Sequence, residues 1–249
     1  MAVTTERRGE VLVIRMDRPA RRNAVDAVMT AGLDDALNAL DDDPALRVGV
    51  LTGTSQVFSA GTDLVDGAGP ATARGGEYGL ARRRRRTPLV AAVEGPALGG
   101  GFELLLACDL VVASRTAVLG LPEVRLGLVA NCGGLFRGPR QLPLNVARQM
   151  LLTGEPLSAE RAWSLGLVNV LSEPGEALRD ALVLADRICA GSPAAVSATL
   201  EAVDASFAQA DADGWRATES AWAQATASVD STEGVEAFLA RRAPRWSRS

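Results

Sequence analysis

The chain has 249 residues, with 26 basic and 30 acidic side chains and no histidine, and every basic residue is an arginine. These counts exclude a Ser-His-Asp triad, a histidine-ligated metal site, a Schiff-base lysine and a P-loop lysine. Acid–base chemistry therefore falls to the carboxylates, with the single tyrosine, Tyr78, and three cysteines as the other candidates.

Composition also bounds the class of protein. The length and the 47% hydrophobic content suit one large domain with a sizeable core. A net charge of −4 and 4% aromatic residues give no reason to expect nucleic-acid binding. The three cysteines form no CxxC pair, and the charged N-terminus is unlike a signal peptide. We therefore expect a cytoplasmic protein without a disulfide framework, a metal site or a membrane span.

Taken in chain order, the hydrophobic pattern alternates between strands and helices before it becomes wholly helical from about Ala147. Asp26 is a candidate N-cap for the first helix. This alternation predicts an α/β fold with βαβ crossovers. The predicted strands are residues 11–16, 48–52, 89–93 and 110–113, and the predicted helices are residues 26–40, 102–107, 146–152, 159–165, 175–190, 194–207 and 214–227.

Two segments of small residues are candidates for holding negative charge through backbone amides. Residues 58–64 (FSAGTDL) follow the strand over 48–52, and Gly99-Gly100-Gly101 precedes the helix over 102–107. Glycines at a helix entrance expose N–H groups at the positive end of the helix dipole. One N–H from each segment could hold a developing oxyanion, although each segment alone also fits an ordinary turn.

Two glutamates are candidates for an acid–base pair. Glu103 lies in the first turn of an otherwise apolar helix, where a carboxylate is costly to bury without a partner or a purpose. Glu123 lies in a loop after another apolar segment. A helix-dipole interaction for Glu103 and a surface turn for Glu123 remain the simpler interpretations, because spacing alone does not bring the two together.

Several stretches together resemble the crotonase family, also called the enoyl-CoA hydratase/isomerase superfamily. The resemblance implies a spiral of ββα units over residues 1–190 and a C-terminal α-helical trimerisation region over residues 191–249. It also implies a homotrimer or a dimer of trimers, an acyl-CoA thioester as substrate, and no cofactor besides the coenzyme A of that substrate. The matching stretches are residues 18–25, 51–64, 88–114, 121–129, 152–171 and 233–246.

The resemblance also implies roles for individual residues. The oxyanion hole is formed by the N–H after the Ala-Gly pair and by the middle glycine of the GGG run, which are Thr62 and Gly100 here. Both glutamates of the hydratases are kept as Glu103, expected to be the base on water, and Glu123, expected to carry the proton to the α-carbon. The expected CoA- or substrate-binding residues are Arg22, Ala24, Ala60, Asp63 and Leu64, with Phe238 and Arg241 reaching the CoA of a neighbouring subunit.

The leading interpretation is therefore an enoyl-CoA hydratase. A Δ3,Δ2-enoyl-CoA isomerase, which can work with one glutamate that shuttles a proton, or another crotonase-type acyl-CoA enzyme is the alternative. After residues 127–129 many hydratases carry Pro-Gly, whereas this chain has Ala130-Asn131-Cys132, a departure that argues against plain short-chain hydration. The run Arg82–Arg86 leaves a non-catalytic, RNA-binding homologue as a less favoured possibility. We expect this run to be a solvated helix end, since the acidic balance of the chain argues against RNA.

Overall fold

The computed structural model describes residues 2–247, and its largest element is a six-stranded sheet with the strand order β1-β2-β3-β4-β6-β9. β1 is antiparallel to β2, and all other neighbours in the sheet are parallel. The strands β3 and β4 are buried at every residue, as expected for a parallel sheet covered on both faces. The strands are β1 (Val3–Arg8), β2 (Val11–Met16), β3 (Val48–Thr52), β4 (Leu89–Val93), β6 (Leu110–Ser114) and β9 (Val170–Ser172).

A second, smaller sheet consists of β5 (Pro96–Leu98), β7 (Val118–Gly120) and β8 (Leu157–Ser158). Two of its strands directly follow strands of the first sheet, β5 after β4 and β7 after β6, whereas β8 follows a helix. The chain turns from β4 into β5 at Gly95, where a Cβ would lie 2.0 Å from the Gln56 carbonyl oxygen, so this tight corner requires glycine. Successive units thus place strands in both sheets, which is the expected spiral arrangement.

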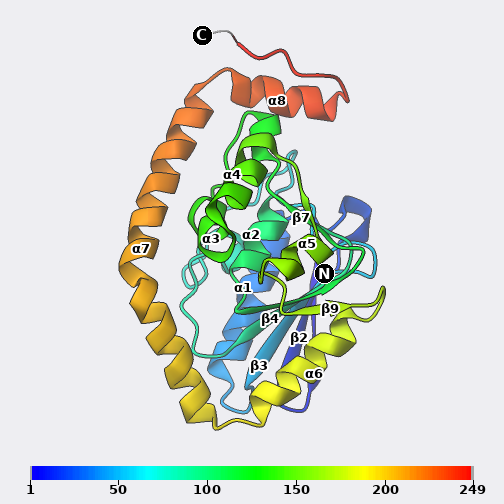
Figure 1. The fold of residues 1–249 in the computed structure, drawn as a ribbon, viewed down its shortest axis with the longest axis vertical. Coiled ribbons are helices and arrows are strands. Elements are labelled where there is room, and N and C mark those ends of the chain that lie inside the picture. Colours follow the sequence, from blue (N-terminus) through cyan, green and yellow to red (C-terminus); the bar gives the residue numbers. More distant parts are fainter. Residues whose placement is uncertain (1, 248–249) are drawn as a thin grey trace.

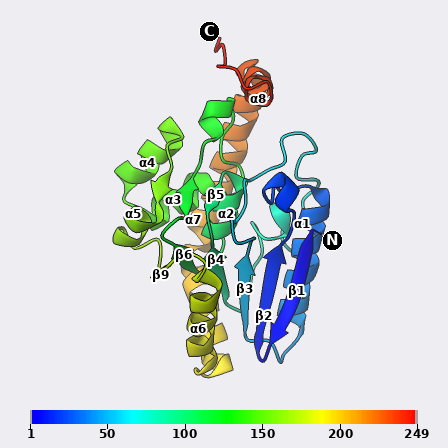
Figure 2. The same ribbon diagram turned by 90° about the vertical axis from the view of Figure 1, so that its right-hand side faces the viewer.

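Helices cover both faces of the large sheet (Figures 1 and 2). α1 (Ala27–Asp42) begins at Asp26, whose carboxylate accepts a hydrogen bond from the Met29 N–H at 2.8 Å, as the N-cap prediction requires. α6 (Ala177–Cys189) packs its small residues against β3, β4 and β6 on the other face. The remaining core helices are α2 (Gly100–Leu106), α3 (Gly134–Gln141), α4 (Leu144–Thr153) and α5 (Ala159–Ser164), with short 3-10 turns at Pro19–Arg21 (η1), Glu77–Gly79 (η2) and Glu123–Leu126 (η3).

The C-terminal part consists of α7 (Pro193–Ala227) and α8 (Asp230–Leu239). α7 runs along one whole side of the molecule and connects α6 to α8 (Figure 1). The two separate helices predicted over 194–207 and 214–227 are wrong, because α7 continues through Gly214. A Cβ on Gly214 would lie 2.5 Å from Cγ of Phe136, so the glycine permits close packing of α3 on α7 and does not end the helix.

The arginine run is not a solvated helix end, and that expectation is wrong. Residues 81–86 alternate between buried and exposed, the pattern of an extended segment. The inward Arg83 binds Asp34 at 2.5 Å and Asp41 at 2.9 Å, and the inward Arg85 binds Asp109 through both of its terminal nitrogens. Two of the five arginines therefore form buried ion pairs within the protein.

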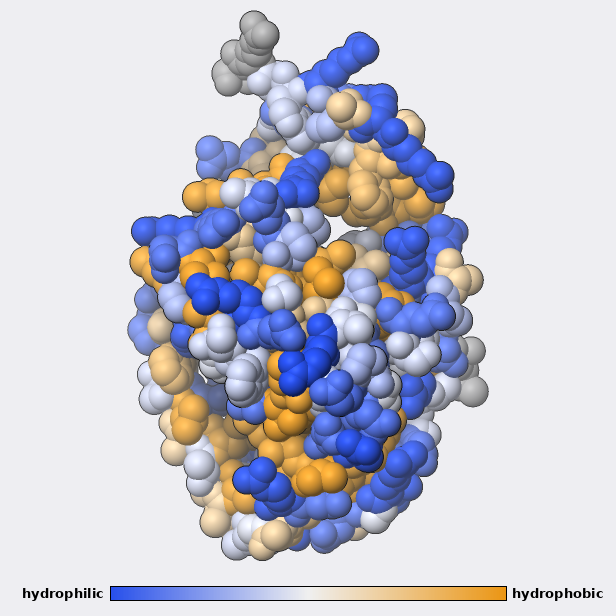
Figure 3. Space-filling model, turned by 45° about the vertical axis from the view of Figure 1, so that its right-hand side comes forward, coloured by the Kyte–Doolittle hydropathy of each residue, from blue (hydrophilic) through white to orange (hydrophobic). Residues whose placement is uncertain are grey.

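The surface is mixed, and on the face in Figure 3 apolar patches lie between charged side chains. No single helix among residues 2–247 is long and apolar enough to cross a membrane. α6 and α7 together have the length and composition of a membrane span, but they are bent by 105° where they meet.

Candidate active site

The two predicted amide-bearing segments lie side by side. Residues 58–64 run beside β5, with Leu98 N–H donating to the Ser59 carbonyl oxygen at 3.0 Å. A Cβ on Gly61 would lie 2.9 Å from the backbone nitrogen of Gly100. The glycine at 61, which has a φ of +92°, therefore permits the close approach that brings Thr62 next to the start of α2.

Both candidate amides point away from the surrounding secondary structure. Thr62 forms a parallel bridge with Val25, in which Gly61 C=O accepts from Val25 and Asp63 N–H donates to Val25. The alternation of an extended chain turns the intervening Thr62 N–H to the opposite side. Gly100 is the first residue of α2, so its N–H has no partner in the helix. Neither N–H donates a hydrogen bond to another residue within 2–247.

Glu103 is anchored by one of its two carboxylate oxygens. Its side chain is buried in α2, and its Oε1 accepts from the Cys132 N–H at 2.7 Å and from the Gly134 N–H at 2.9 Å. A Cβ on Gly134 would lie 3.0 Å from this Oε1, so the turn into α3 needs glycine to reach the carboxylate. The buried Oε2 has no hydrogen-bond partner among the described residues, which leaves it available to a ligand.

Glu123 reaches the same place from η3. A Cβ on Gly99 would lie 3.3 Å from Oε1 of Glu123, while Gly99 C=O accepts from the backbone N–H of Glu103. Oε2 of Glu123 is also buried without a partner in residues 2–247. Glu123 thus comes close enough to Glu103 for the charge of Glu103 to raise its pKa, a proximity that the sequence alone did not establish.

The C-terminal helix supports the segment that carries Glu123. α8 packs directly on η3, since a Cβ on Gly234 would lie 2.2 Å from the Leu126 carbonyl oxygen. A Cβ on Gly127 would likewise lie 2.2 Å from the carbonyl oxygen of Asp230. Residues more than 100 positions apart in the sequence therefore position one of the two glutamates.

The environment of the pair favours its protonated forms. Burial raises the pKa of Glu103 to about 7, although the Gly134 and Cys132 amides and Arg137 act in the opposite direction. Burial and the neighbouring charge of Glu103 raise the pKa of Glu123 to about 8. The pKa values of both carboxyl groups are therefore raised and influence each other, and the two amide donors favour the charged form of Glu103.

The residues expected to bind CoA form two groups. Ala60 N–H donates to the Arg22 carbonyl oxygen at 3.0 Å, so exposed Arg22 and Ala60 lie together, with Ala24 two residues further along the loop. Leu64 is partly buried in the segment that follows Thr62. Phe238 and Arg241 are exposed at the end of α8, and a contact between them and a neighbouring subunit stays a prediction.

Asp63 is placed differently from an exposed ligand contact. Its buried carboxylate binds the Arg18 guanidinium at 2.7 Å and accepts from two backbone amides, which lowers its pKa against the effect of burial. Sequence reasoning missed Arg18 and the fully buried Asn23, whose amide donates to the carbonyl oxygens of Val57 and Phe58. Both belong to the stretch 18–25. Because this stretch contains several arginines, residue type alone did not show that Arg18 and Asn23 anchor the neighbouring residues 57–63.

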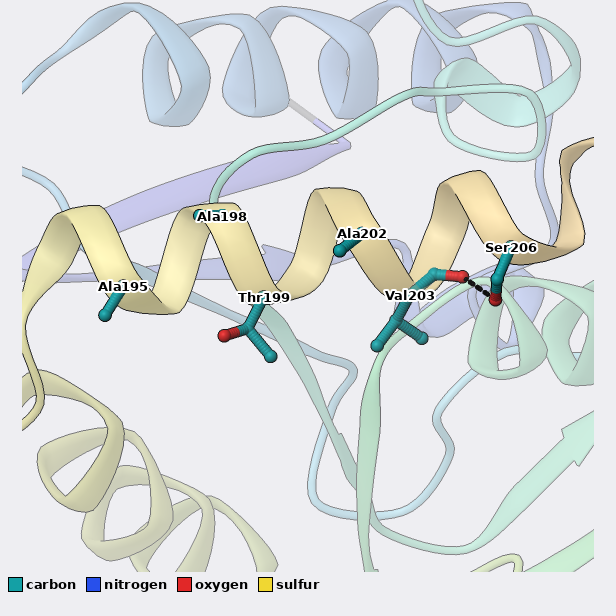
Figure 4. Close-up of a pocket in the computed structure, with 6 residues that line it drawn as sticks. All are labelled: Ala195, Ala198, Thr199, Ala202, Val203 and Ser206. Atoms are coloured by element: carbon teal, nitrogen blue, oxygen red, sulfur yellow. Dashed lines mark hydrogen bonds between the residues drawn. The ribbon is translucent and has the colours of Figure 1, made fainter.

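Two further observations concern possible ligands. Among residues 2–247, no group of three or more His, Cys, Asp or Glu side chains could hold a metal ion. A shallow groove of about 590 Å³ lies on α7 and is lined by Ala195, Ala198, Thr199, Ala202, Val203 and Ser206 (Figure 4). None of the acid–base or amide groups described above lines this groove.

Comparison with known proteins gives a consistent result. A family model described as enoyl-CoA hydratase/isomerase matches residues 6–249. The enoyl-CoA hydratase EchA19 of Mycobacterium tuberculosis is 36% identical over 97% of this chain and 94% of its own length. A carnitinyl-CoA dehydratase of Salmonella typhi is 38% identical over 96% of each chain. The solved structure of EchA1_1 from Mycobacterium paratuberculosis is 41% identical, with a TM-score of 0.93 over 100% of this chain and 99% of that chain.

The fold and the paired carboxylates thus define an enzyme with the crotonase fold, as the sequence resemblance implied. The chain belongs to the enoyl-CoA hydratase/isomerase family, and within it to the hydratase type of carbon–oxygen lyase.

Proposed function

We propose that this protein adds water across the double bond of a 2-enoyl-CoA thioester, and catalyses the reverse dehydration of a 3-hydroxyacyl-CoA. The observation that carries this proposal is the pair Glu103 and Glu123, whose charges interact and whose Oε2 atoms are both buried without a partner in residues 2–247, together with two backbone amides that donate to no described residue. The relatives named enoyl-CoA hydratase and carnitinyl-CoA dehydratase support the same reaction type.

The amides of Thr62 and Gly100 bind the thioester oxygen and stabilise the enolate that forms there. Such donors act strongly in a site without bulk water, and removal of one typically costs about 3 kcal/mol of transition-state stabilisation. Apolar neighbours such as Leu121 and Ala130 lie around the anchored Glu103, which is consistent with a dry site.

The two glutamates divide the proton transfers. Ionised Glu103, fixed by its two amide donors, takes a proton from water through Oε2 as the water oxygen bonds to the β-carbon. Protonated Glu123 gives its proton to the α-carbon as the enolate collapses to the thioester. The product has gained one water, and the proton now on Glu103 returns to Glu123 by exchange before the next turnover.

The coenzyme A part of the substrate binds at the exposed loop around Arg22. The guanidinium at position 22 is suited to phosphate, and the small side chains of Ala24 and Ala60 leave room for the nucleotide and the pantetheine arm. Leu64 contacts the acyl portion. Phe238 and Arg241 complete the site of a neighbouring subunit in a homotrimer or dimer of trimers.

The test is a panel of 2-enoyl-CoA and 3-enoyl-CoA thioesters of several chain lengths, assayed with the parent protein, Glu103→Gln and Glu123→Gln. We expect hydration of at least one 2-enoyl-CoA and a loss of at least 1,000-fold in kcat (about 4 kcal/mol) in each variant, with thioester affinity nearly unchanged. Parental hydration rates in both variants would refute the two-glutamate mechanism. Conversion of 3-enoyl-CoA alone would instead identify an isomerase.

A further inference from the structure

Tyr78 contacts both residues whose amides form the proposed oxyanion hole. It is the single tyrosine of the chain and is 2% exposed. Its hydroxyl shares a hydrogen bond of 2.6 Å with Oγ1 of Thr62. A Cβ on Gly100 would lie 2.3 Å from the same hydroxyl oxygen, so the tip of the phenol touches the Gly100 backbone. Nothing in the mechanism above uses this side chain.

A rigid turn delivers Tyr78 to this position. Tyr78 has a φ of +57°, a left-handed conformation that a bulky residue adopts only where its surroundings enforce it. A Cβ on Gly79 would lie 2.7 Å from the backbone nitrogen of Asp34 in α1, and one on Gly75 would lie 1.8 Å from the Gly79 carbonyl oxygen. The turn is thus packed against α1 and closed on itself, so the phenol has little freedom to move.

The same hydroxyl also faces the part of the site that holds Glu103. It interacts with the Cys132 thiol, and the backbone N–H of Cys132 donates to Glu103 at 2.7 Å. Burial raises the pKa of Tyr78 well above its usual range. The phenol therefore keeps its proton at neutral pH and is a neutral hydrogen-bonding group.

We propose that Tyr78 is a positioning residue, whose hydroxyl bond to Thr62 holds the Thr62 amide at the spacing from the Gly100 amide that the enolate oxygen requires. The inference rests on the proposed function, because it assigns Tyr78 to the oxyanion hole of that reaction. Its physical basis is the steep dependence of amide–oxyanion stabilisation on geometry, which makes a supporting contact visible in kcat.

The test compares Tyr78→Phe, Thr62→Val and the double variant, since each single change removes one hydroxyl while keeping the shape of the side chain. We expect each single variant to lose about tenfold in kcat with KM nearly unchanged, the size of one neutral hydrogen bond. The double variant should lose no more than either single one, because both changes break the same bond. Thr62→Ser should recover most of the kcat that Thr62→Val loses.

A second readout does not depend on turnover. We measure the affinity for a 3-ketoacyl-CoA, which ionises to an enolate, and for the saturated acyl-CoA of the same length. Tyr78→Phe should weaken the first by about tenfold and leave the second unchanged. This comparison remains informative if the parent hydrates no enoyl-CoA, so failure of the proposed function and failure of this inference are distinguishable.

Thr52→Val is the matched control. It removes an equally buried hydroxyl, which donates to the Ala92 carbonyl oxygen at 2.9 Å within the large sheet. It should lower the unfolding temperature without changing the ratio of the two affinities. Parental kcat and enolate affinity in Tyr78→Phe, or losses that multiply in the double variant, would overturn the proposal. A KM increase that grows with acyl length would also overturn it, by placing Tyr78 against the acyl chain.

Discussion

At the scale of single residues, the reactivity of the site depends on where one proton lies. Glu103 and Glu123 are both acidic residues that burial pushes toward neutrality, but their surroundings differ. Two amides stabilise the charge on Glu103, whereas Glu123 has no such donor beyond its own backbone and faces the charge of Glu103. The same residue type thus has two different environments, and these are the basis for the proposed functions of Glu103 as base and Glu123 as acid.

This asymmetry predicts a bell-shaped dependence of kcat/KM on pH. With pKa values of about 7 for Glu103 and about 8 for Glu123, activity should rise as pH increases toward 7, because the base ionises, and fall above 8, because the acid is lost. Initial rates at substrate concentrations well below KM, measured across a series of pH values, give this profile. Glu94→Gln is the control, since Glu94 is also buried but accepts from the Ala177 N–H at the start of α6, so the shape of its profile should match the parent. A flat profile between pH 5 and 10 (roughly 2 units beyond each pKa) would contradict the assignment.

At the scale of elements, the position of residues 58–64, which carry the Thr62 amide, depends on the loop that precedes α1. Asn23 is fully buried, and its side-chain amide donates to the carbonyl oxygens of Val57 and Phe58 at 3.1 and 3.0 Å. Ser59 in turn donates to the Asn23 carbonyl oxygen. These bonds fix residues 57–59, which lead to Thr62. Their partner, Asn23, lies more than 30 positions away in the sequence.

We therefore expect Asn23→Ala to lower the free energy of unfolding by about 2 to 3 kcal/mol. The Phe58 carbonyl oxygen loses its side-chain donor and the Arg18 N–H loses its acceptor, whereas the Val57 carbonyl oxygen keeps a donor within its own loop. Chemical denaturation measures this loss. Asn23 has a φ of +53°, so part of the loss would be backbone strain in alanine. Asn23→Gly avoids the backbone strain but also lacks the side-chain hydrogen bonds. A fully parental stability in that variant would show that these hydrogen bonds contribute nothing.

The elements differ in how far the sequence predicts them. β2, β3 and β4 were predicted with the bounds the structure has, since buried parallel strands are continuous apolar runs. β1 was missed because VTTERR is polar and exposed, and it is a strand only through pairing with β2. The pairing of Arg83 and Arg85 with aspartates was missed for a similar reason. It depends on partners in α1 and before β6 that a local pattern does not contain.

The site shows the same division. Glu103, Glu123, Thr62 and Gly100 were predicted because short motifs carry them, and the structure brings all four to the two sides of Gly99 and Gly61. Tyr78 carried no such signal. Its place beside Thr62 follows from a left-handed turn held against α1, a long-range contact that residue type and spacing do not encode.

At the scale of the whole molecule, α7 is the element whose surroundings are incomplete. Of its 35 residues, Thr218 alone is buried, although the helix carries many alanines and exposed Val203 and Phe207. Asp211 on its inner side binds Arg140 at 2.5 Å, and Trp215 packs edge-on against Phe136 of α3, so both charged and aromatic contacts hold the helix to the body. The groove in Figure 4 leaves small, largely apolar side chains open. A helix of this length with an uncovered apolar face is typical of an interface between subunits.

The expected homotrimer or dimer of trimers gives this face an occupant, a second copy of the chain. We therefore predict that Val203→Arg, which places a charge in the groove, converts the parent assembly into smaller species, because an unpaired buried charge strongly opposes association. Light scattering coupled to size-exclusion chromatography measures the mass. Val183→Arg on α6 is the matched control, since Val183 is 56% exposed and Val203 is 52% exposed. An unchanged mass in Val203→Arg, or a monomeric parent, would show that α7 does not form the interface. Loss of hydration in the dissociated variant, with its unfolding temperature retained, would further indicate that Phe238 and Arg241 act on the substrate of a neighbouring subunit.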